Sequence, residues 1–147
     1  MQADAIVEPW FARTVELYPE LTARFLTAEE DPFRNPVGHA LRQSLATLAN
    51  ELVGEMDKEK IAAALDDIVR IRAVQDFSPS EAVGFIFLAK PIIRRLTTSD
   101  YDFFDRRIDE LVLLAFNAYM RCREQLADVR IHEAQRALGR YWHPEQG

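Results

Sequence analysis

Three histidines and a single cysteine are the residues that could hold a metal ion or a haem. No two of His39, His132 and His143 have the spacing of three or four residues that places two ligands on one helical face. Cys122 lies ten residues before His132. His39 follows a glycine at a helix start and His132 falls among charged residues, whereas an axial haem ligand faces an apolar pocket. We therefore predict no metal site and no bound cofactor.

Pairs of carboxylates are the next candidates, because two carboxyl groups in an apolar cleft can perform general acid–base catalysis. The acidic clusters at residues 29–31, 66–67 and 109–110 fall in a loop or on helix faces expected to be solvated. Gly-x-Ser-x-Gly, a P-loop and a Gly-rich dinucleotide turn are all absent from the sequence. We predict no catalytic residues and a protein that is not an enzyme.

The most unusual polar cluster is Arg72, Gln75 and Asp76, in the run Arg-Ile-Arg-Ala-Val-Gln-Asp-Phe-Ser-Pro-Ser at residues 70–80. One interpretation is structural: the side chains satisfy the free backbone groups where one helix ends and the next begins. The other is a polar patch that binds a small anion or a partner near a helix N-terminus. We favour the structural interpretation, since any helix junction needs its backbone groups satisfied.

Apolar periodicity predicts the helices that must position these residues. Apolar side chains recur every three or four residues over 6–18, 20–28 and 37–52, and again in a helix capped by Asp57. In the second of these helices we expect Leu21, Phe25 and Leu26 to point inward. Two prolines and an asparagine within residues 29–36 predict a loop.

The run Ser-Pro-Ser-Glu at residues 78–81 is a capping box, so residues 79–89 are predicted to form a fully buried central helix. Pro91 should kink or end it near Lys90. Between Asp100 and Arg140 there is no proline, which predicts a helix of about 40 residues and about 60 Å, longer than the domain is wide.

We therefore expect an all-α fold, a single helical bundle of five to six helices within residues 1–147. Its core should cover about residues 5–118, and the long C-terminal helix should project from about 119 to 140. A coiled-coil-like stripe on the projecting part predicts a dimer helix. The stripe consists of Tyr119, Cys122, Leu126 and Val129.

Composition excludes several classes of protein. The 147 residues include 24 acidic and 18 basic ones, a net charge of −6 that argues against a nucleic-acid binder. One cysteine excludes an internal disulfide framework. Asp4 and Glu8 occupy an N-terminus without an apolar region, and nothing approaches 18 consecutive apolar residues. We predict a cytoplasmic protein without membrane insertion.

Several motifs together carry a family resemblance. They are Tyr-Pro at 18–19, Asp-Pro-Phe-Arg-Asn-Pro at 31–36, Arg-Ala-Val-Gln-Asp-Phe-Ser-Pro-Ser-Glu-Ala-Val-Gly-Phe at 72–85, Lys90 with Arg94, Ala-Phe at 115–116, Tyr119, and Cys-Arg-Glu at 122–124. Over roughly residues 10–133 the chain resembles the N-terminal domain of RsbT co-antagonist proteins of the RsbRD type. The resemblance implies a sensory or regulatory input domain. Related domains are helical, globin-like, free of haem and dimeric, and a long helix joins them to a STAS domain.

This sequence ends at Gly147 without a STAS domain, so it is expected to be a free-standing family member or an excised domain. The resemblance implies a non-catalytic sensory or scaffolding module in stress signalling. It would act through homodimerisation and through contact with a STAS-domain or other signalling protein. The alternative is a globin-like sensor that binds a small molecule or haem. Its apolar cavity would lie near Phe85, Phe87 and Phe116, with Arg72 or Gln75 as the polar anchor.

Overall fold

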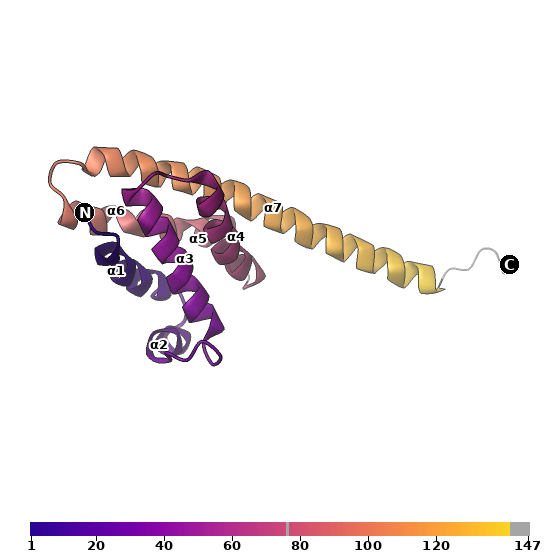
Figure 1. Ribbon diagram of the computed structural model, residues 1–147. Helices are drawn as coiled ribbons and strands as arrows, with labels where there is room; N and C mark the ends of the chain where they lie inside the picture. Colours follow the sequence, from indigo (N-terminus) through magenta and orange to yellow (C-terminus); the bar gives the residue numbers. More distant parts are fainter. Residues whose placement is uncertain (76, 142–147) are drawn as a thin grey trace.

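The computed structural model describes residues 1–75 and 77–141, and its elements are all helical (Figure 1). They confirm the predicted all-α class with a long C-terminal helix. In chain order they are α1 (Asp4–Val15), α2 (Glu20–Ala28), α3 (Pro36–Val53), α4 (Lys58–Val74), α5 (Pro79–Gly84), the 3₁₀ turn η1 (Phe85–Leu88), α6 (Ala89–Leu96) and α7 (Tyr101–Tyr141).

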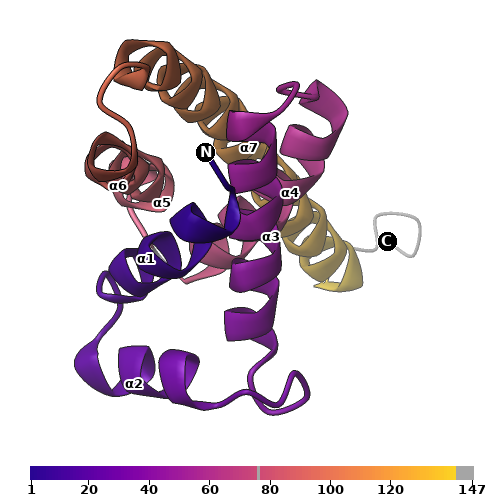
Figure 2. The ribbon, with the colours of Figure 1, turned by 60° about the vertical axis from the view of Figure 1, so that its left-hand side comes forward.

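The core forms where α4 packs against both α3 and α7 (Figure 2). Helix α1 lies across α3 and contacts η1 and α6, which in turn contact α7. The Trp10 side chain on α1 is fully buried, and its indole Nε1 donates a hydrogen bond to the Phe85 carbonyl at 2.9 Å. This bond satisfies a buried polar group at each end and joins the first helix to the centre of the bundle.

Capping side chains define the starts of three helices. The Asp57 carboxylate accepts hydrogen bonds from the backbone N–H groups of Glu59 and Lys60, so the predicted cap of α4 is confirmed. Ser78 and Glu81 form the predicted capping box of α5. Helix α3 begins at a cap that the sequence analysis did not identify. There the Asn35 side-chain oxygen accepts from the Gly38 N–H at 2.9 Å.

Asn35 also joins three segments of the chain. Its side chain is 3% exposed, and its Nδ2 donates to the carbonyls of Leu26 and Glu29, both at 2.9 Å. One amide therefore caps α3 and satisfies carbonyls at the end of α2 and in the following loop. The close fit extends to Gly38, where an added Cβ would lie 2.3 Å from Asn35 Nδ2.

The central segment differs from the predicted buried helix over residues 79–89. It is divided into α5, η1 and α6, and Phe87 in η1 is 47% exposed. Proline lacks an N–H group, and its ring clashes with the carbonyl four residues earlier. For Pro91 that residue is Phe87, so the tighter 3₁₀ turn falls where the clash must be relieved.

Helix α2 has the predicted bounds, but its buried face is narrower than expected. Leu26 is buried, whereas Leu21 is 79% exposed and Phe25 is 48% exposed. The helix lies at the edge of the bundle and packs only against α1 and α3 among the described elements. A short helix held by two neighbours at its edge buries one side chain fully rather than three.

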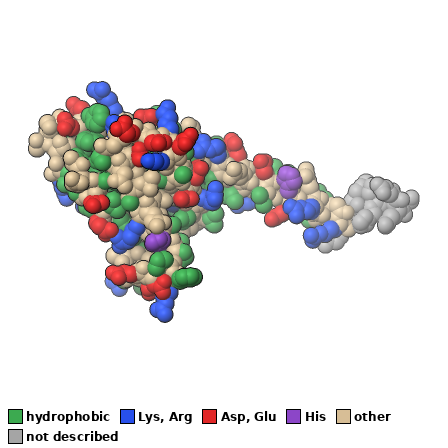
Figure 3. Space-filling view, in the orientation of Figure 1, with side chains coloured by type: hydrophobic (Ala, Val, Ile, Leu, Met, Phe, Trp, Pro, Cys, Tyr) green, Lys and Arg blue, Asp and Glu red, His purple; other side chains and the backbone are tan. Residues whose placement is uncertain are grey.

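Helix α7 has 41 residues and extends far beyond the bundle (Figures 1 and 3). Its core-facing side remains in contact with the bundle through Tyr119, Cys122 and Leu126, and residues 127–140 are all exposed. The projecting part therefore begins near Ala127 in the structure, rather than near residue 119. None of the helices in the described part of the chain is long and apolar enough to cross a membrane.

Candidate functional site

Arg72 is the most unusual side chain in the bundle because it is fully buried. It lies in the last turn of α4 and has 0% exposure. Ile61, Leu65 and Ile68 precede it at the helical spacing that defines the core-facing side of α4. Arg72 occupies the next position on that side, so its guanidinium is carried into the interior.

Three aromatic rings surround the guanidinium. Its central carbon lies 4.2 Å from the ring centroid of Phe77, 5.4 Å from that of Phe85 and 5.5 Å from that of Tyr18. Tyr18 and Phe77 also contact each other edge to face, with centroids 5.4 Å apart. Aromatic faces attract a cation, and this attraction is stronger where water is excluded. The rings therefore supply part of the stabilisation that the buried charge has lost from water.

The hydrogen bonding of the guanidinium is incomplete. Its Nη2 donates to the Glu81 carbonyl at 2.9 Å. Its Nε and Nη1 are buried and have no hydrogen-bond partner among the described residues. Buried polar groups are paired in the great majority of cases, because an unpaired one loses its hydration without compensation. Arg72 thus keeps unused donors inside the fold.

The surroundings also change the titration of the neighbouring groups. Burial lowers the pKa of Arg72, and the nearby Tyr18 and Glu81 act in the opposite direction. Burial raises the pKa of the Tyr18 phenol, against the effect of the Arg72 charge. Hydrogen bonds from Ser78 lower the pKa of Glu81, with a smaller contribution from Arg72. Arginine stays protonated at neutral pH in proteins, so the Arg72 guanidinium among these aromatic rings is a cation.

The structure places two of the three residues of the predicted polar patch, and it separates them by burial. Arg72 is buried, whereas Gln75 is exposed at the C-cap of α4, where its N–H bonds to the carbonyls of Ile71 and Arg72. Asp76 lies outside the described residues. The cap of α5 comes from Ser78. Sequence reasoning missed Tyr18, Phe77 and Glu81 around the arginine, although the position of Arg72 on the apolar side of α4 was readable from the spacing.

A pocket of about 220 Å³ adjoins the buried arginine. Besides Arg72 it is lined by Leu17, Phe77, Glu81, Gly84 and Leu88. It differs from the cavity expected near the three phenylalanines: Phe85 is fully buried, whereas Phe87 and Phe116 are 47% and 48% exposed, and none of them lines it.

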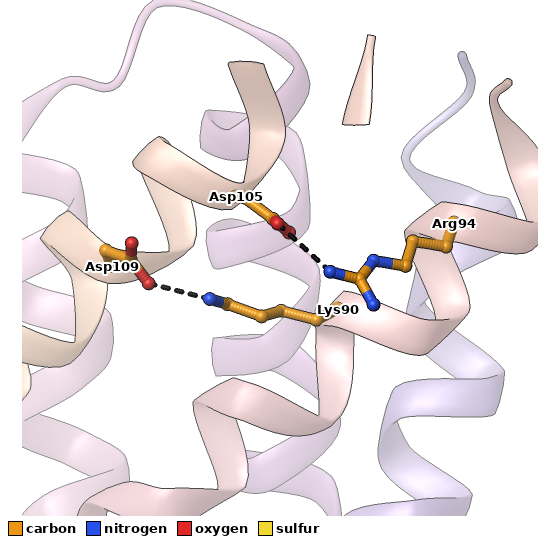
Figure 4. A network of polar contacts seen from close by, with 4 residues as sticks. All are labelled: Lys90, Arg94, Asp105 and Asp109. Carbon is orange, nitrogen blue, oxygen red and sulfur yellow. Dashed lines mark hydrogen bonds and ion pairs between the residues drawn. The ribbon is translucent and has the colours of Figure 1, made fainter. Parts of the chain in front are cut away.

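Two ion pairs attach α6 to the beginning of α7 (Figure 4). Lys90 Nζ lies 2.8 Å from Asp109 Oδ1, and Arg94 Nη2 lies 3.3 Å from Asp105 Oδ2. Both basic residues belong to the motifs that carry the family resemblance. The pairs lie on the surface and help to orient α7 where it enters the bundle.

We predict that the Lys90–Asp109 pair contributes little to stability. A double-mutant cycle with Lys90→Met and Asp109→Asn should give a coupling of less than about 1 kcal/mol, because water and salt screen exposed pairs. Urea denaturation of the four proteins measures this quantity. A coupling above about 2 kcal/mol would show that the pair supports the fold.

The predicted dimer stripe is divided between the core and the surface. Tyr119 and Cys122 are 3% and 9% exposed and pack into their own bundle, and the Tyr119 hydroxyl donates to the Phe77 carbonyl at 3.5 Å. Leu126 is half-buried against the same core, and Val129 is 52% exposed. The dimer helix stays a prediction.

A different apolar stripe follows the outward side of α7. Its members recur at intervals of 3, 4, 7, 4, 3 and 4 residues, and all are exposed. We call it the outer stripe: Leu113, Phe116, Met120, Ala127, Ile131, Ala134 and Leu138. At 100° per residue these seven positions fall within a narrow band, and from Leu113 to Leu138 the band contains no polar residue.

The remaining candidates for metal chemistry are separate from one another. No group of three or more His, Cys, Asp or Glu side chains that could hold a metal ion occurs within residues 1–75 and 77–141. His132 is exposed on α7, with its Nδ1 2.8 Å from the Asp128 carbonyl. Cys122 is buried, as expected for a free cysteine at a helix contact. His143 lies outside the described residues.

These features define an all-α domain with a buried arginine and a long emergent helix. The chain matches the model of the RsbT co-antagonist protein rsbRD N-terminal domain over residues 4–134, and it belongs to that family. Domains of this family are stress-signalling regulatory domains of a non-catalytic kind.

Among curated proteins, an uncharacterized protein of Archaeoglobus fulgidus is 31% identical over 84 residues. The match covers 53% of this chain and 54% of the relative, so it spans about half of that protein's length. No solved structure matches the chain.

Proposed function

We propose that this chain is a non-catalytic sensory or scaffolding module of stress signalling that acts as a homodimer through the outer stripe of α7. The observation that carries the proposal is the stripe itself, which combines heptad-like spacing with the exposure of every one of its members. Such spacing lets two helices pack side by side along a continuous seam. Ile131 and Leu138 are 53% and 69% exposed. In the first half of the helix, Leu113 is 68% exposed and Phe116 is 48% exposed.

The isolation of the projecting segment also supports a partner. Residues 127–140 are helical but are exposed throughout, so no burial of an apolar face against the bundle holds them. A helical segment as short as residues 127–140 is only marginally stable in water without such packing. A second helix along the outer stripe would supply it.

The charges beside the stripe favour a second copy of the same chain over a strongly charged partner. Both acidic and basic side chains occur along this part of α7 (Figure 3), and they include Arg123, Glu124, Asp128 and Arg130. A surface with both signs is self-complementary, and in a twofold dimer the same patch faces itself. The tips of the projecting helices would remain available to a STAS-domain or other signalling protein. We place the protein in the cytoplasm as part of the same proposal.

Hydrogen exchange measured at two concentrations tests this proposal. We expect backbone amides of residues 127–138 to exchange slowly at about 100 µM protein and quickly at about 1 µM, because dilution separates the copies. Amides of α4 serve as the internal control and should not depend on concentration. Equally fast exchange of residues 127–138 at both concentrations would contradict the proposal.

A further inference from the structure

The pocket beside Arg72 has the chemistry of a binding site for a small anion. It is lined by Arg72, whose guanidinium is fully buried and whose Nε and Nη1 find no hydrogen-bond partner among the described residues. A fold that buries a cation with unused donors loses hydration energy at that position. A ligand with acceptor oxygens would restore those interactions.

The lining of the pocket defines the rest of the ligand. Leu17, Phe77, Gly84 and Leu88 present hydrocarbon surface and no side-chain hydrogen-bond donor. Leu17 is 45% exposed and marks the side that faces solvent. A volume of about 220 Å³ is below the range of drug-sized sites and suits a molecule of roughly ten non-hydrogen atoms.

We propose that this pocket binds a small organic monocarboxylate. The carboxylate pairs with Arg72, and the apolar body of the ligand lies against Phe77, Leu17 and Leu88. Charge-assisted hydrogen bonds between a guanidinium and a carboxylate are among the strongest polar contacts in proteins. Binding at this pocket does not require the dimer, so a failure of either proposal leaves the other intact.

The charge balance favours a monoanion over phosphate or sulfate. The site offers one cation, and the Glu81 carboxylate lies close enough to affect it electrostatically. That carboxylate accepts a hydrogen bond from the Ser78 backbone N–H at 3.1 Å and keeps its negative charge, as its lowered pKa indicates. A dianion would therefore face one positive and one negative group in an apolar pocket, where charges interact strongly.

Thermal unfolding in the presence of defined probes tests the proposal. We expect benzoate at about 10 mM to raise Tm by about 3–6 °C, with a dependence on concentration that fits one site. Benzamide has nearly the same shape without the charge, and sodium sulfate has charge without the apolar body. Neither should raise Tm by more than about 1 °C. The proposal is overturned if benzoate has no effect, or if benzamide or sulfate acts equally well.

A substitution that fills the pocket provides the second test. A Cβ added at Gly84 would meet nothing within 4 Å, and Gly84 lines the pocket in a helix with φ near −63°. Gly84→Leu should therefore leave the fold intact, occupy the ligand's space and weaken benzoate binding at least tenfold by calorimetry. Gly139→Leu is the matched control, since Gly139 is also in open space but lies near the far end of α7.

Arg72→Lys tests the polar half of the site. It keeps the charge and removes the planar set of donors, so benzoate binding should fall at least tenfold if that protein folds. If it does not fold, the Gly84→Leu result decides the question. Wild-type affinity for benzoate in Gly84→Leu would overturn the proposal, and so would a loss of affinity in Gly139→Leu as large as that in Gly84→Leu.

Discussion

Replacing Asn35 with alanine is expected to lower the free energy of unfolding by about 2–4 kcal/mol. The change removes the cap of α3 and both hydrogen bonds from Nδ2 to the Leu26 and Glu29 carbonyls. A lost cap costs about 1 kcal/mol, and the buried Leu26 carbonyl and the part-buried Glu29 carbonyl each add a penalty of up to similar size when they lose this partner. Urea denaturation followed by circular dichroism measures the difference.

Asn50→Ala is the matched control for that prediction, because Asn50 is an exposed residue of the same helix. Alanine is the better helix former at an exposed interior position, so this variant should be as stable as the wild type or slightly more stable. Asn35→Asp keeps the acceptor that caps α3 but places a second carboxylate oxygen against the Leu26 and Glu29 carbonyl oxygens in a buried position, so it should be at least as destabilised as Asn35→Ala. A loss below about 1 kcal/mol in Asn35→Ala would contradict the role assigned to the amide.

The paired change Ile131→Glu and Leu138→Glu is expected to raise the dissociation constant of the dimer at least 100-fold. Both side chains are exposed in the isolated chain, so the bundle should fold normally. The folded variant should have the same helical content by circular dichroism as the wild type. In the proposed dimer the substitutions bury like charges in an apolar seam, which is strongly unfavourable. Sedimentation equilibrium over a range of concentrations measures the constant.

Val129→Glu separates the two sides of α7. Val129 is 52% exposed, close to the value for Ile131 at 53%, but it lies on the side of Leu126 and Cys122 instead of the outer stripe. This variant should keep the dissociation constant within about threefold of the wild type. If Val129→Glu separates the dimer and the paired outer change does not, the seam follows the originally predicted stripe and our choice of the outer stripe is wrong.

Local signals in the sequence predicted the starts of helices well. Asp57 and the Ser78–Glu81 capping box act within a few residues of themselves, so their roles follow from chain geometry. Asn35 stands before a proline in a predicted loop, and the cap it forms has the same local character. Its bonds to Leu26 and Glu29 depend on how α2 and the loop return to α3, and no local pattern specifies them.

The candidate site needed tertiary contacts that periodicity does not supply. Arginine is almost never fully buried, and the interpretation of Arg72 as a helix-end or surface residue followed from its type. Its burial results from the aromatic side chains of the segments at Tyr18 and Phe77, which the fold brings over α4. Periodicity also leaves α7 ambiguous, because this helix carries two apolar stripes with helical spacing and the spacing does not decide which of them is buried. The position of α4 decides that Tyr119 faces inward and Met120 faces outward.

The molecular mass of the unmodified chain in solution tests the central claim most directly. Sedimentation velocity at about 50 µM should give a single species of twice 16.9 kDa, with monomer appearing on dilution as mass action requires. A mass of 16.9 kDa at every concentration up to about 500 µM would contradict the proposal that this regulatory domain works as a homodimer through α7.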